Sequence, residues 1–382
     1  MTTASYHTIS YLMKIGIAKS VSVGFCVRMC HCFLIFLWTR MGLCRILLSV
    51  CLILFLGSVV YICTYNHNMS IYVNAFSFAM YVYMDFMFGK GQEKDKARFM
   101  RLRRLITVDK NKLVKRKGIL ADRVTIPVRD GAKIDMYTYT PESIASEPSR
   151  PLLFFCHGGG WVFANRSKSE RVLCDYALKT NSVVTYIDYR LSPEYKHPTA
   201  SNDCYDCLMY ILQHKEEFHI DENRIVLFGD SAGGQLSCAL VQMALREFHS
   251  NIFRKLVLIY PAMDSRAIPA EEYTWEERNL ILENTWGLSS WIGEYMVDWY
   301  FETEENVNDP LSSPVLCDEF ASFPETVMIT NEYDPLRIPA RAAYEKMKNS
   351  GLNVKYHCVK GAVHALWGSP LNVLGFNDLV LE

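Results

Sequence analysis

The chain has 382 residues, of which 50% are hydrophobic and 21% charged, and its formal net charge is −1. This length suffices for one large α/β domain with additional segments. The near-neutral charge does not indicate a nucleic-acid-binding protein, which would carry an excess of basic residues. The charge is unevenly distributed, because residues 1–84 hold five of the 40 basic residues and no acidic residue.

The first element predicted is a membrane-spanning helix. Residues 1–45 form a basic segment, and residues 46–65 (ILLSVCLILFLGSVVYICTY) carry no charge. That stretch is long enough to cross a bilayer as a helix. Basic residues before the span favour a cytoplasmic N-terminus, which puts the rest of the chain on the lumenal or extracellular side. We therefore expect a signal-anchor helix.

The following segment, residues 66–105, is first apolar and aromatic and then basic, and it offers a competing topology. If Ile71–Phe88 also crossed the membrane, the body of the chain would return to the cytoplasm. Asp85 lies inside this stretch, and five aromatic residues lie between Phe76 and Phe86. Both features fit an interfacial or cap helix better than a second span.

Cysteines and glycosylation patterns bear on the compartment. Of the 13 cysteines, Cys204 and Cys207 form a CxxC within a helical pattern, without a second pair or histidines at zinc spacing. We interpret this pair as structural and expect no metal ion and no cofactor. A lumenal body could carry one disulfide. Asn68 and Asn165 begin N-glycosylation acceptor patterns.

From residue 106 to residue 382 the pattern predicts one domain in which strands alternate with helices. A hairpin (Arg123–Val128 and Asp135–Tyr139) precedes strands at Leu152–Cys156, Ser182–Asp188, Arg224–Phe228, Lys255–Tyr260, Glu325–Thr330 and Asn353–Cys358. Helical patterns occupy Lys168–Lys179, Ala200–Leu212, Gly234–Glu247 and Arg341–Asn349. This alternation implies an α/β fold with a mostly parallel sheet covered on both faces.

One insertion, about residues 265–308, breaks the alternation and contains four tryptophans: Trp275, Trp286, Trp291 and Trp299. We expect it to form a helical cap over the strand ends, where ligands bind in open parallel sheets.

The chemistry begins with the run Gly229-Asp230-Ser231-Ala232-Gly233. It lies between a strand pattern and a helical pattern, as a nucleophile elbow requires. Glycines flank the serine because the tight turn leaves no room for side chains. The helix N-terminus behind Ser231 adds partial positive charge where an oxyanion would form. We therefore predict Ser231 as a nucleophile.

A glycine loop at residues 157–160 supplies donors for that oxyanion. It directly follows a predicted strand and matches the HGGG-type motif of lipases and esterases. We predict Gly158 and Gly159 as the main donors and the N–H of Ala232 as the third. The predicted oxyanion hole thus comprises His157, Gly158, Gly159, Gly160 and Ala232, in which His157 holds the loop rather than acting as a base.

A serine nucleophile also needs a base and a group that orients the base. His364 follows the last predicted strand and is the candidate base. Asp334, just beyond the strand Glu325–Thr330, is the candidate orienting acid, with Glu332 as its rival. The chain order Ser231, Asp334, His364 is the one expected for an α/β hydrolase.

The combined motifs resemble the hormone-sensitive-lipase family of α/β hydrolases. They are HGGGW at 157–161, YRLSPE at 189–194, GDSAGG at 229–234, DPLSSP at 309–314, DPL at 334–336 and the late His364. With the N-terminal span, the chain most resembles the branch that contains arylacetamide deacetylase and neutral cholesterol ester hydrolase. This resemblance implies an α/β-hydrolase fold with a helical cap.

The resemblance also implies a function and a location. Members of that branch are single-pass endoplasmic-reticulum proteins with a lumenal catalytic domain, and they hydrolyse lipid esters, xenobiotic esters and arylamides. We therefore expect a membrane-anchored serine esterase whose partners are a lipophilic small-molecule ester and the bilayer. The alternative is a ligand-binding receptor on a hydrolase scaffold. In the receptor relatives the catalytic histidine is replaced, so the intact His364 argues against it.

The chain departs from the family pattern at two points. Arg337-Ile338-Pro339 replaces an acidic pair and a glycine, and Ala365-Leu366 replaces Gly-Phe after the base. Because proline fits the first turn of a helix, we expect an adjusted helix start rather than lost catalysis.

Overall fold

The computed structural model describes residues 71–89, 93–106, 110–266, 274, 288, 290–368 and 373–381. All of them belong to one compact unit, Asn68–Glu382. The predicted basic segment 1–45, the predicted span 46–65 and the acceptor Asn68 lie outside these residues. Within the described ranges, no helix combines the length and the apolar character that crossing a membrane requires.

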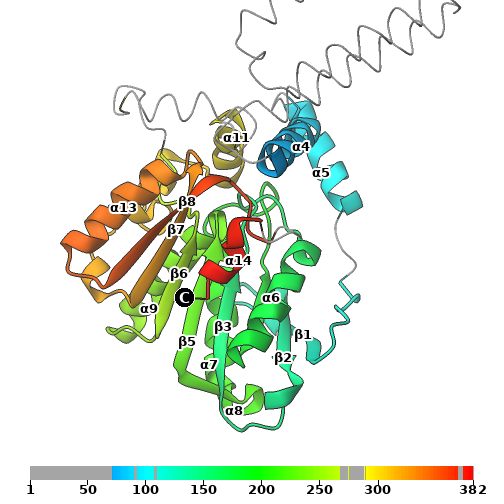
Figure 1. The fold of residues 1–382 in the computed structure, drawn as a ribbon, viewed down its shortest axis with the longest axis vertical. Coiled ribbons are helices and arrows are strands. Elements are labelled where there is room, and N and C mark those ends of the chain that lie inside the picture. Colours follow the sequence, from blue (N-terminus) through cyan, green and yellow to red (C-terminus); the bar gives the residue numbers. More distant parts are fainter. Residues whose placement is uncertain are drawn as a thin grey trace, which may run out of the picture. The chain divides into compact units, whose positions relative to one another are not determined.

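Eight strands form one sheet in the order β1-β2-β4-β3-β5-β6-β7-β8 (Figure 1). The strands are β1 (Ile119–Pro127), β2 (Lys133–Pro141), β3 (Arg150–Cys156), β4 (Val183–Asp188), β5 (Ile220–Asp230), β6 (Lys255–Ile259), β7 (Glu325–Tyr333) and β8 (Val354–Val363). β2 pairs antiparallel with β1 and β4, and every other pairing is parallel. The mostly parallel sheet predicted from the sequence is confirmed, and the predicted hairpin forms its antiparallel edge.

The parallel strands are apolar along their length because helices cover both faces of the sheet. α7 (Thr199–Gln213), α9 (Ala232–Phe248) and α13 (Arg337–Asn349) pack on one face, and α6 (Arg166–Thr180) and α14 (Phe376–Leu379) pack on the other. The short α8 (Lys215–Phe218) precedes β5. Four 3-10 turns complete the described elements: η2 (Glu142–Ile144), η4 (Pro314–Leu316), η5 (Phe320–Ser322) and η6 (Val373–Gly375).

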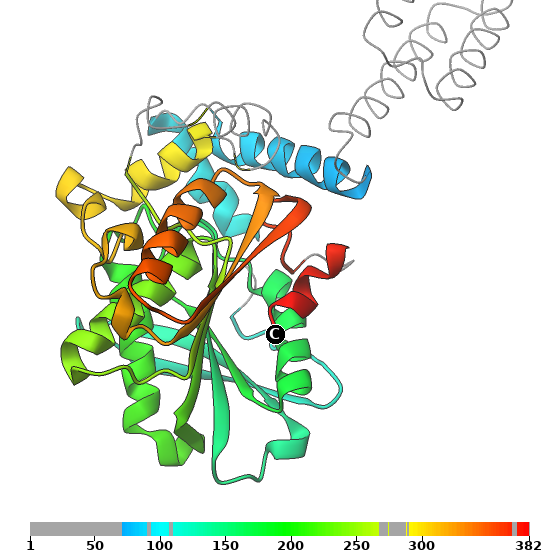
Figure 2. The same cartoon turned by 60° about the vertical axis from the view of Figure 1, so that its left-hand side comes forward.

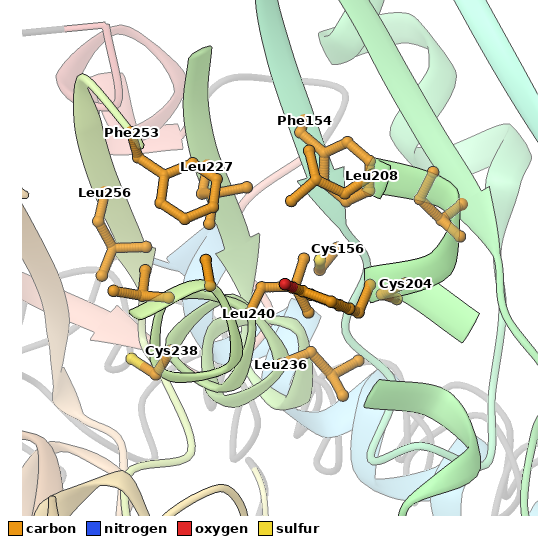
Figure 3. Close-up of a cluster of buried hydrophobic side chains, with 14 of the residues drawn as sticks. Phe154, Cys156, Cys204, Leu208, Leu227, Leu236, Cys238, Leu240, Phe253 and Leu256 are labelled. Atoms are coloured by element: carbon orange, nitrogen blue, oxygen red, sulfur yellow. The ribbon is translucent and has the colours of Figure 1, made fainter. Parts of the chain in front are cut away.

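The spacing of leucines on α9 explains how this helix is held under the sheet. Leu236 and Leu240 lie one turn apart and are fully buried against Leu227 of β5 and Leu208 of α7 (Figure 3). Burial of each such side chain stabilises the fold by about 1.5–3 kcal/mol. Because α9 begins at Ala232, this packing also fixes the turn that precedes it.

The start of α13 reflects the first departure from the family pattern. The helix begins at Arg337, four residues before the predicted start, and Pro339 lies in its first turn, as expected. The missing N–H of a proline costs no hydrogen bond there, because the first-turn N–H groups have no partner within the helix.

Three helices gather at the end of the sheet where β5 and β7 finish (Figures 1 and 2). They are α4 (Ile71–Phe88), α5 (Glu93–Ile106) and α11 (Ser290–Tyr300), and the short α12 (Glu304–Val307) follows. Phe88, Phe99 and Trp299 are buried in one cluster with ring centroids 4.9–5.3 Å apart. The described part of the predicted 265–308 insertion therefore packs together with the segment 71–106, and we call α4, α5 and α11 the cap. Trp275 and Trp286 lie outside the described residues.

The seven cysteines of the described ranges are all free thiols. Cys204 and Cys207 lie in α7 and pack into the core, where burial raises the pKa of both thiols. In the part of the chain that the structure describes, no cluster of His, Cys, Asp or Glu is arranged to hold a metal ion.

Candidate active site

Ser231 occupies a strained turn between β5 and α9. Its φ of 56° and ψ of −120° are sparsely populated for a residue with a side chain, which is typical of a functional turn. The flanking glycines are sterically required, since a Cβ on Gly229 would lie 2.2 Å from the Gly233 carbonyl oxygen. A Cβ on Gly233 would lie 1.9 Å from the Cys156 carbonyl oxygen. The turn is fixed from the other side by the Ser231 N–H, which donates to the Ile259 carbonyl (2.8 Å).

The structure brings Ser231, His364 and Asp334 together from three separate loops. The Nε2 atom of His364 lies 3.0 Å from the Ser231 Oγ, and its Nδ1 lies 2.6 Å from an Asp334 oxygen. Asp334 is fully buried, and its second oxygen accepts the Leu336 N–H (2.9 Å). A buried carboxylate at Nδ1 leaves Nε2 unprotonated, so that Nε2 can accept the serine proton.

Glu332, the rival acid, is engaged elsewhere. One of its oxygens pairs with the Lys360 ammonium (2.8 Å) and the other accepts the Gly361 N–H (2.8 Å). Glu332 therefore joins β7 to β8, whereas Asp334 faces the histidine.

The oxyanion loop requires one correction to the predicted donors. The Gly158 N–H donates to a carboxylate oxygen of Asp230 (2.7 Å), so it does not face a substrate. Gly158 is also confined there, because a Cβ would lie 2.5 Å from the Asp230 carbonyl oxygen. The N–H groups of Gly159 and Gly160 have no acceptor among the described residues. Ala232 is the first residue of α9, so its N–H has no acceptor within that helix. These three remain as candidate oxyanion donors.

His157 anchors this loop within the protein. Its ring stacks on those of Tyr186 and Tyr189, with centroids 5.0 and 4.0 Å away, and Nδ1 lies 2.7 Å from the Gly158 carbonyl. Its own carbonyl accepts the Tyr189 hydroxyl (2.8 Å). Burial lowers the pKa of His157 to about 4, so the ring is neutral at pH 7. These contacts join the start of the loop to β4 and to the chain that follows it.

The site opens into a cavity of about 490 Å³ that Ser231, His364 and Gly158–Gly160 line together. The cap supplies apolar wall to the cavity from Met80, Tyr83, Met84, Met296 and Val297, and Leu288, just before α11, adds to it. Trp161 also lines the cavity. Its ring stacks on that of Tyr300 (centroids 4.8 Å apart), and its indole N–H donates to the Gln235 side-chain oxygen (2.8 Å). The arrangement can hold an apolar group beside an activated serine.

Two residues of the site were given no role from the sequence. Asp230 lies inside the elbow motif, and burial raises the pKa of its carboxyl. Lys168 lines the cavity from the first turn of α6, where the sequence predicts only a helix. The position of Asp230 next to the serine was the one available signal, whereas nothing local marks Lys168. The acceptor Asn165 lies at the N-cap of the same helix, where its side chain accepts the Lys168 N–H (3.1 Å).

Comparison with known proteins gives the same family. A family model described as alpha/beta hydrolase fold matches residues 153–368. An arylesterase of Saccharolobus solfataricus is 29% identical over 57% of this chain and 69% of its own length. The arylacetamide deacetylase of Oryctolagus cuniculus is 24% identical over 64% of this chain and 75% of its own length.

Solved structures agree with these matches. The Pyrobaculum calidifontis esterase has a TM-score of 0.62 at 27% identity, covering 68% of this chain and 82% of that chain. The chain spans 60 to 69% of the length of four curated relatives that it matches. The family model covers more than half of the chain, and the motif-based resemblance to the hormone-sensitive-lipase family is confirmed. The chain belongs to the alpha/beta hydrolase fold family.

Proposed function

We propose that this protein is a serine hydrolase of carboxylic esters. The observation that carries the proposal is the hydrogen-bonded series from Asp334 through His364 to Ser231, set beside a cavity. The Ser231 oxygen attacks the ester carbonyl while His364 takes its proton. Gly159, Gly160 and Ala232 donate to the oxyanion of the tetrahedral intermediate.

The acyl-enzyme is then resolved by water. His364 first returns its proton to the departing alcohol oxygen, which breaks the ester bond and leaves the acyl group on Ser231. A water molecule attacks this acyl-serine with His364 again as base, and collapse of the second intermediate releases the acid and restores Ser231. Asp334 stabilises the imidazolium in both halves of the reaction.

We further propose lipophilic esters, with arylamides as a second class, as the substrates. The apolar wall that the cap contributes supports this assignment, as do the names of the arylesterase and arylacetamide deacetylase relatives. The intact contact between His364 and Ser231 favours turnover over the alternative of a binding-only receptor.

The test replaces the nucleophile. Ser231→Ala should abolish both hydrolysis of 4-nitrophenyl butyrate and labelling by a fluorophosphonate probe, while Ser250→Ala, on an exposed loop serine, should change neither. Labelling of Ser231→Ala at the wild-type level would overturn the proposal. Tight binding of a small molecule without turnover by the folded wild-type protein would instead favour the receptor.

We also propose that the protein is anchored in the endoplasmic-reticulum membrane by residues 46–65, as a single-pass type II protein with a lumenal catalytic domain. The outer face of α4 supports a position next to a bilayer, because its exposed side chains include Tyr72, Val82 and Phe86. In sealed microsomes, the domain should resist added protease, and Asn165 should carry an N-glycan. Digestion of the domain without detergent would favour the two-span topology with a cytoplasmic domain.

A further inference from the structure

The wall of the cavity is apolar where the cap contributes and polar at the start of α6. Asn165, Lys168 and Ser169 belong to this second part, close to Ala365 and Trp367 of the loop that follows His364. A cavity that is apolar in one part and polar in another matches a substrate with the same division. Lys168 and Ser169 are the residues of this part whose side chains can bind a polar group of a ligand.

Lys168 is a charged side chain with unused hydrogen-bonding capacity. Its ammonium donates to the Ala365 carbonyl (3.1 Å), and it forms no ion pair with a carboxylate of the described residues. An ammonium carries three donors, so two remain available for a ligand. Burial lowers the pKa of Lys168, because the site gives the charge less solvation than water does. The charge of Asp230 favours the Lys168 ammonium without pairing with it directly, so an anion in the cavity would add a direct counter-charge.

The neighbouring Ser169 adds a donor. The Ser169 side chain is buried and lines the cavity, and its hydroxyl makes no hydrogen bond within the described ranges. The Asn165 side chain is engaged at the N-cap of α6 and is the proposed glycan acceptor, so it does not count among these donors. This part of the wall therefore offers donors to a ligand.

The two carboxylates that line the cavity are both engaged. Asp230 accepts the Gly158 N–H (2.7 Å) and the Tyr260 hydroxyl (3.4 Å). Asp264 binds the Arg266 guanidinium through both of its oxygens (2.9 and 2.7 Å). Burial raises the pKa of the Asp230 carboxyl and the charge of Lys168 partly offsets this, but the two groups make no direct ion pair.

We propose that Lys168, assisted by Ser169, binds a carboxylate on the substrate. The preferred substrates are then amphiphilic esters in which an apolar group occupies the cap side of the cavity and a carboxylate lies at the start of α6. Half-esters of long dicarboxylic acids have this chemistry. This inference rests on the proposed esterase function and names its substrate class.

The test compares esters that differ only in charge. One pair is 4-nitrophenyl octanoate and mono-4-nitrophenyl suberate, which place a methyl or a carboxylate at the end of an equal acyl chain. In the other pair the acyl group is the same, and the phenol of the leaving group carries either a methyl or a carboxylate. The variants are Lys168→Met, which keeps the length of the side chain, and Lys168→Arg, which keeps the charge. Lys179→Met is the matched control, because Lys179 is an exposed lysine on the same helix.

In at least one of the two pairs, Lys168→Met should lower kcat/KM for the charged ester about 20-fold, the size of a lost charge-assisted hydrogen bond. It should change kcat/KM for the neutral ester less than threefold. Lys168→Arg should retain most of the preference, and Lys179→Met all of it. Equal losses on charged and neutral esters would overturn the proposal and leave Lys168 as a positioning residue that acts through Ala365. Unchanged rates on every ester would overturn it as well.

Wild-type protein supplies a second measurement that needs no variant. A wild type that hydrolyses the neutral esters but discriminates more than tenfold against both charged partners would also overturn the proposal. Hydrolysis of the neutral esters in each of these outcomes shows that the esterase function stands, so failure of the carboxylate site is separate from failure of that function.

Discussion

The Gly158 N–H donates to the carboxylate of Asp230, and the 2.7 Å bond joins the oxyanion loop to the residue that precedes the nucleophile. The loop follows β3 and the nucleophile follows β5, and these strands are neighbours in the sheet. The bond therefore links the position of the donors Gly159 and Gly160 to that of the serine they serve.

Replacement of Asp230 by alanine should misplace the oxyanion donors without removing one. We expect kcat for 4-nitrophenyl butyrate to fall about 10- to 100-fold, which is less than the 10²–10³ typical of a deleted donor. Asp230→Asn keeps an oxygen that can accept from Gly158 and should retain most of the activity. Steady-state kinetics beside a thermal melt would check this, and equal activity of the two variants would contradict the role given to the bond.

Gly160 should be intolerant of a side chain for two reasons. Its φ is +57°, and an added Cβ would lie 2.0 Å from the Sδ of Met296 in the cap. We expect Gly160→Ala to lose about 1–2 kcal/mol of stability from the left-handed backbone and to lose activity because the loop or the Met296 side chain in the cavity wall must shift.

A matched control exists at Gly131, in the turn between β1 and β2. Its φ is +83°, and an added Cβ would meet nothing within 4 Å. Gly131→Ala should therefore show a comparable stability loss in denaturant unfolding with normal kcat/KM. Equal activity of the two variants would indicate that the Gly160 backbone has no catalytic importance.

The sequence predicts some features of the active site and not others. The alternation of strands and helices predicted the sheet, and the chain order of Ser231, Asp334 and His364 predicted which loops would meet. Both depend on local pattern and on the topology of the fold. The choice of Gly158 as a donor was wrong because its N–H is taken by a side chain 72 residues further along.

Other features depend on contacts that no local pattern encodes. Glu332 and Asp334 are both acids just beyond the same apolar run, and only their partners separate them: Glu332 binds Lys360 and Gly361, and Asp334 binds His364. The joining of α4 and α5 to α11 depends on aromatic packing between Phe88, Phe99 and Trp299, roughly two hundred residues apart. Lys168 falls in the site because the chain after β8 returns to the start of α6.

His157 should make the stability of the fold depend on pH. Its native pKa of about 4 lies below the ordinary value of 6.5 because the ring is buried. Above pH 6.5 the ring is neutral in both states, and as pH falls toward 4 only the unfolded chain binds the proton. The free energy of unfolding should then fall by about 1.4 kcal/mol per pH unit over that window from this residue alone.

His157→Phe isolates this contribution. Phenylalanine keeps an aromatic ring beside Tyr186 and Tyr189 but loses the Nδ1 hydrogen bond to Gly158, at a cost of about 1 kcal/mol at pH 7. The advantage of wild type over the variant in unfolding free energy should fall by about 2 kcal/mol from pH 7 to pH 5 in urea titrations, so that the variant is the more stable protein at pH 5. A constant difference across that range would mean that His157 is protonated in the native protein.

Arg103 should hold the cap on the domain. Its guanidinium donates to the carbonyls of Val162 (2.9 Å) and Ser192 (2.6 Å) and pairs with Glu194, so α5 is joined to the chain just after the oxyanion loop. Each hydrogen bond from a charged group is worth about 1.5–3 kcal/mol. Arg103→Met should therefore loosen α4 and α5 without unfolding the sheet, which hydrogen exchange would detect as faster exchange in those helices alone.

The same variant should change chain-length preference, because α4 contributes Met80, Tyr83 and Met84 to the cavity wall. We expect kcat/KM for 4-nitrophenyl octanoate to fall more than that for the acetate, since only the longer acyl chain reaches the loosened wall. Arg104→Met, at an exposed position on the same helix, is the control and should leave the ratio unchanged. Identical losses on both esters would indicate that Arg103 acts on the oxyanion loop through Val162 rather than on the cap.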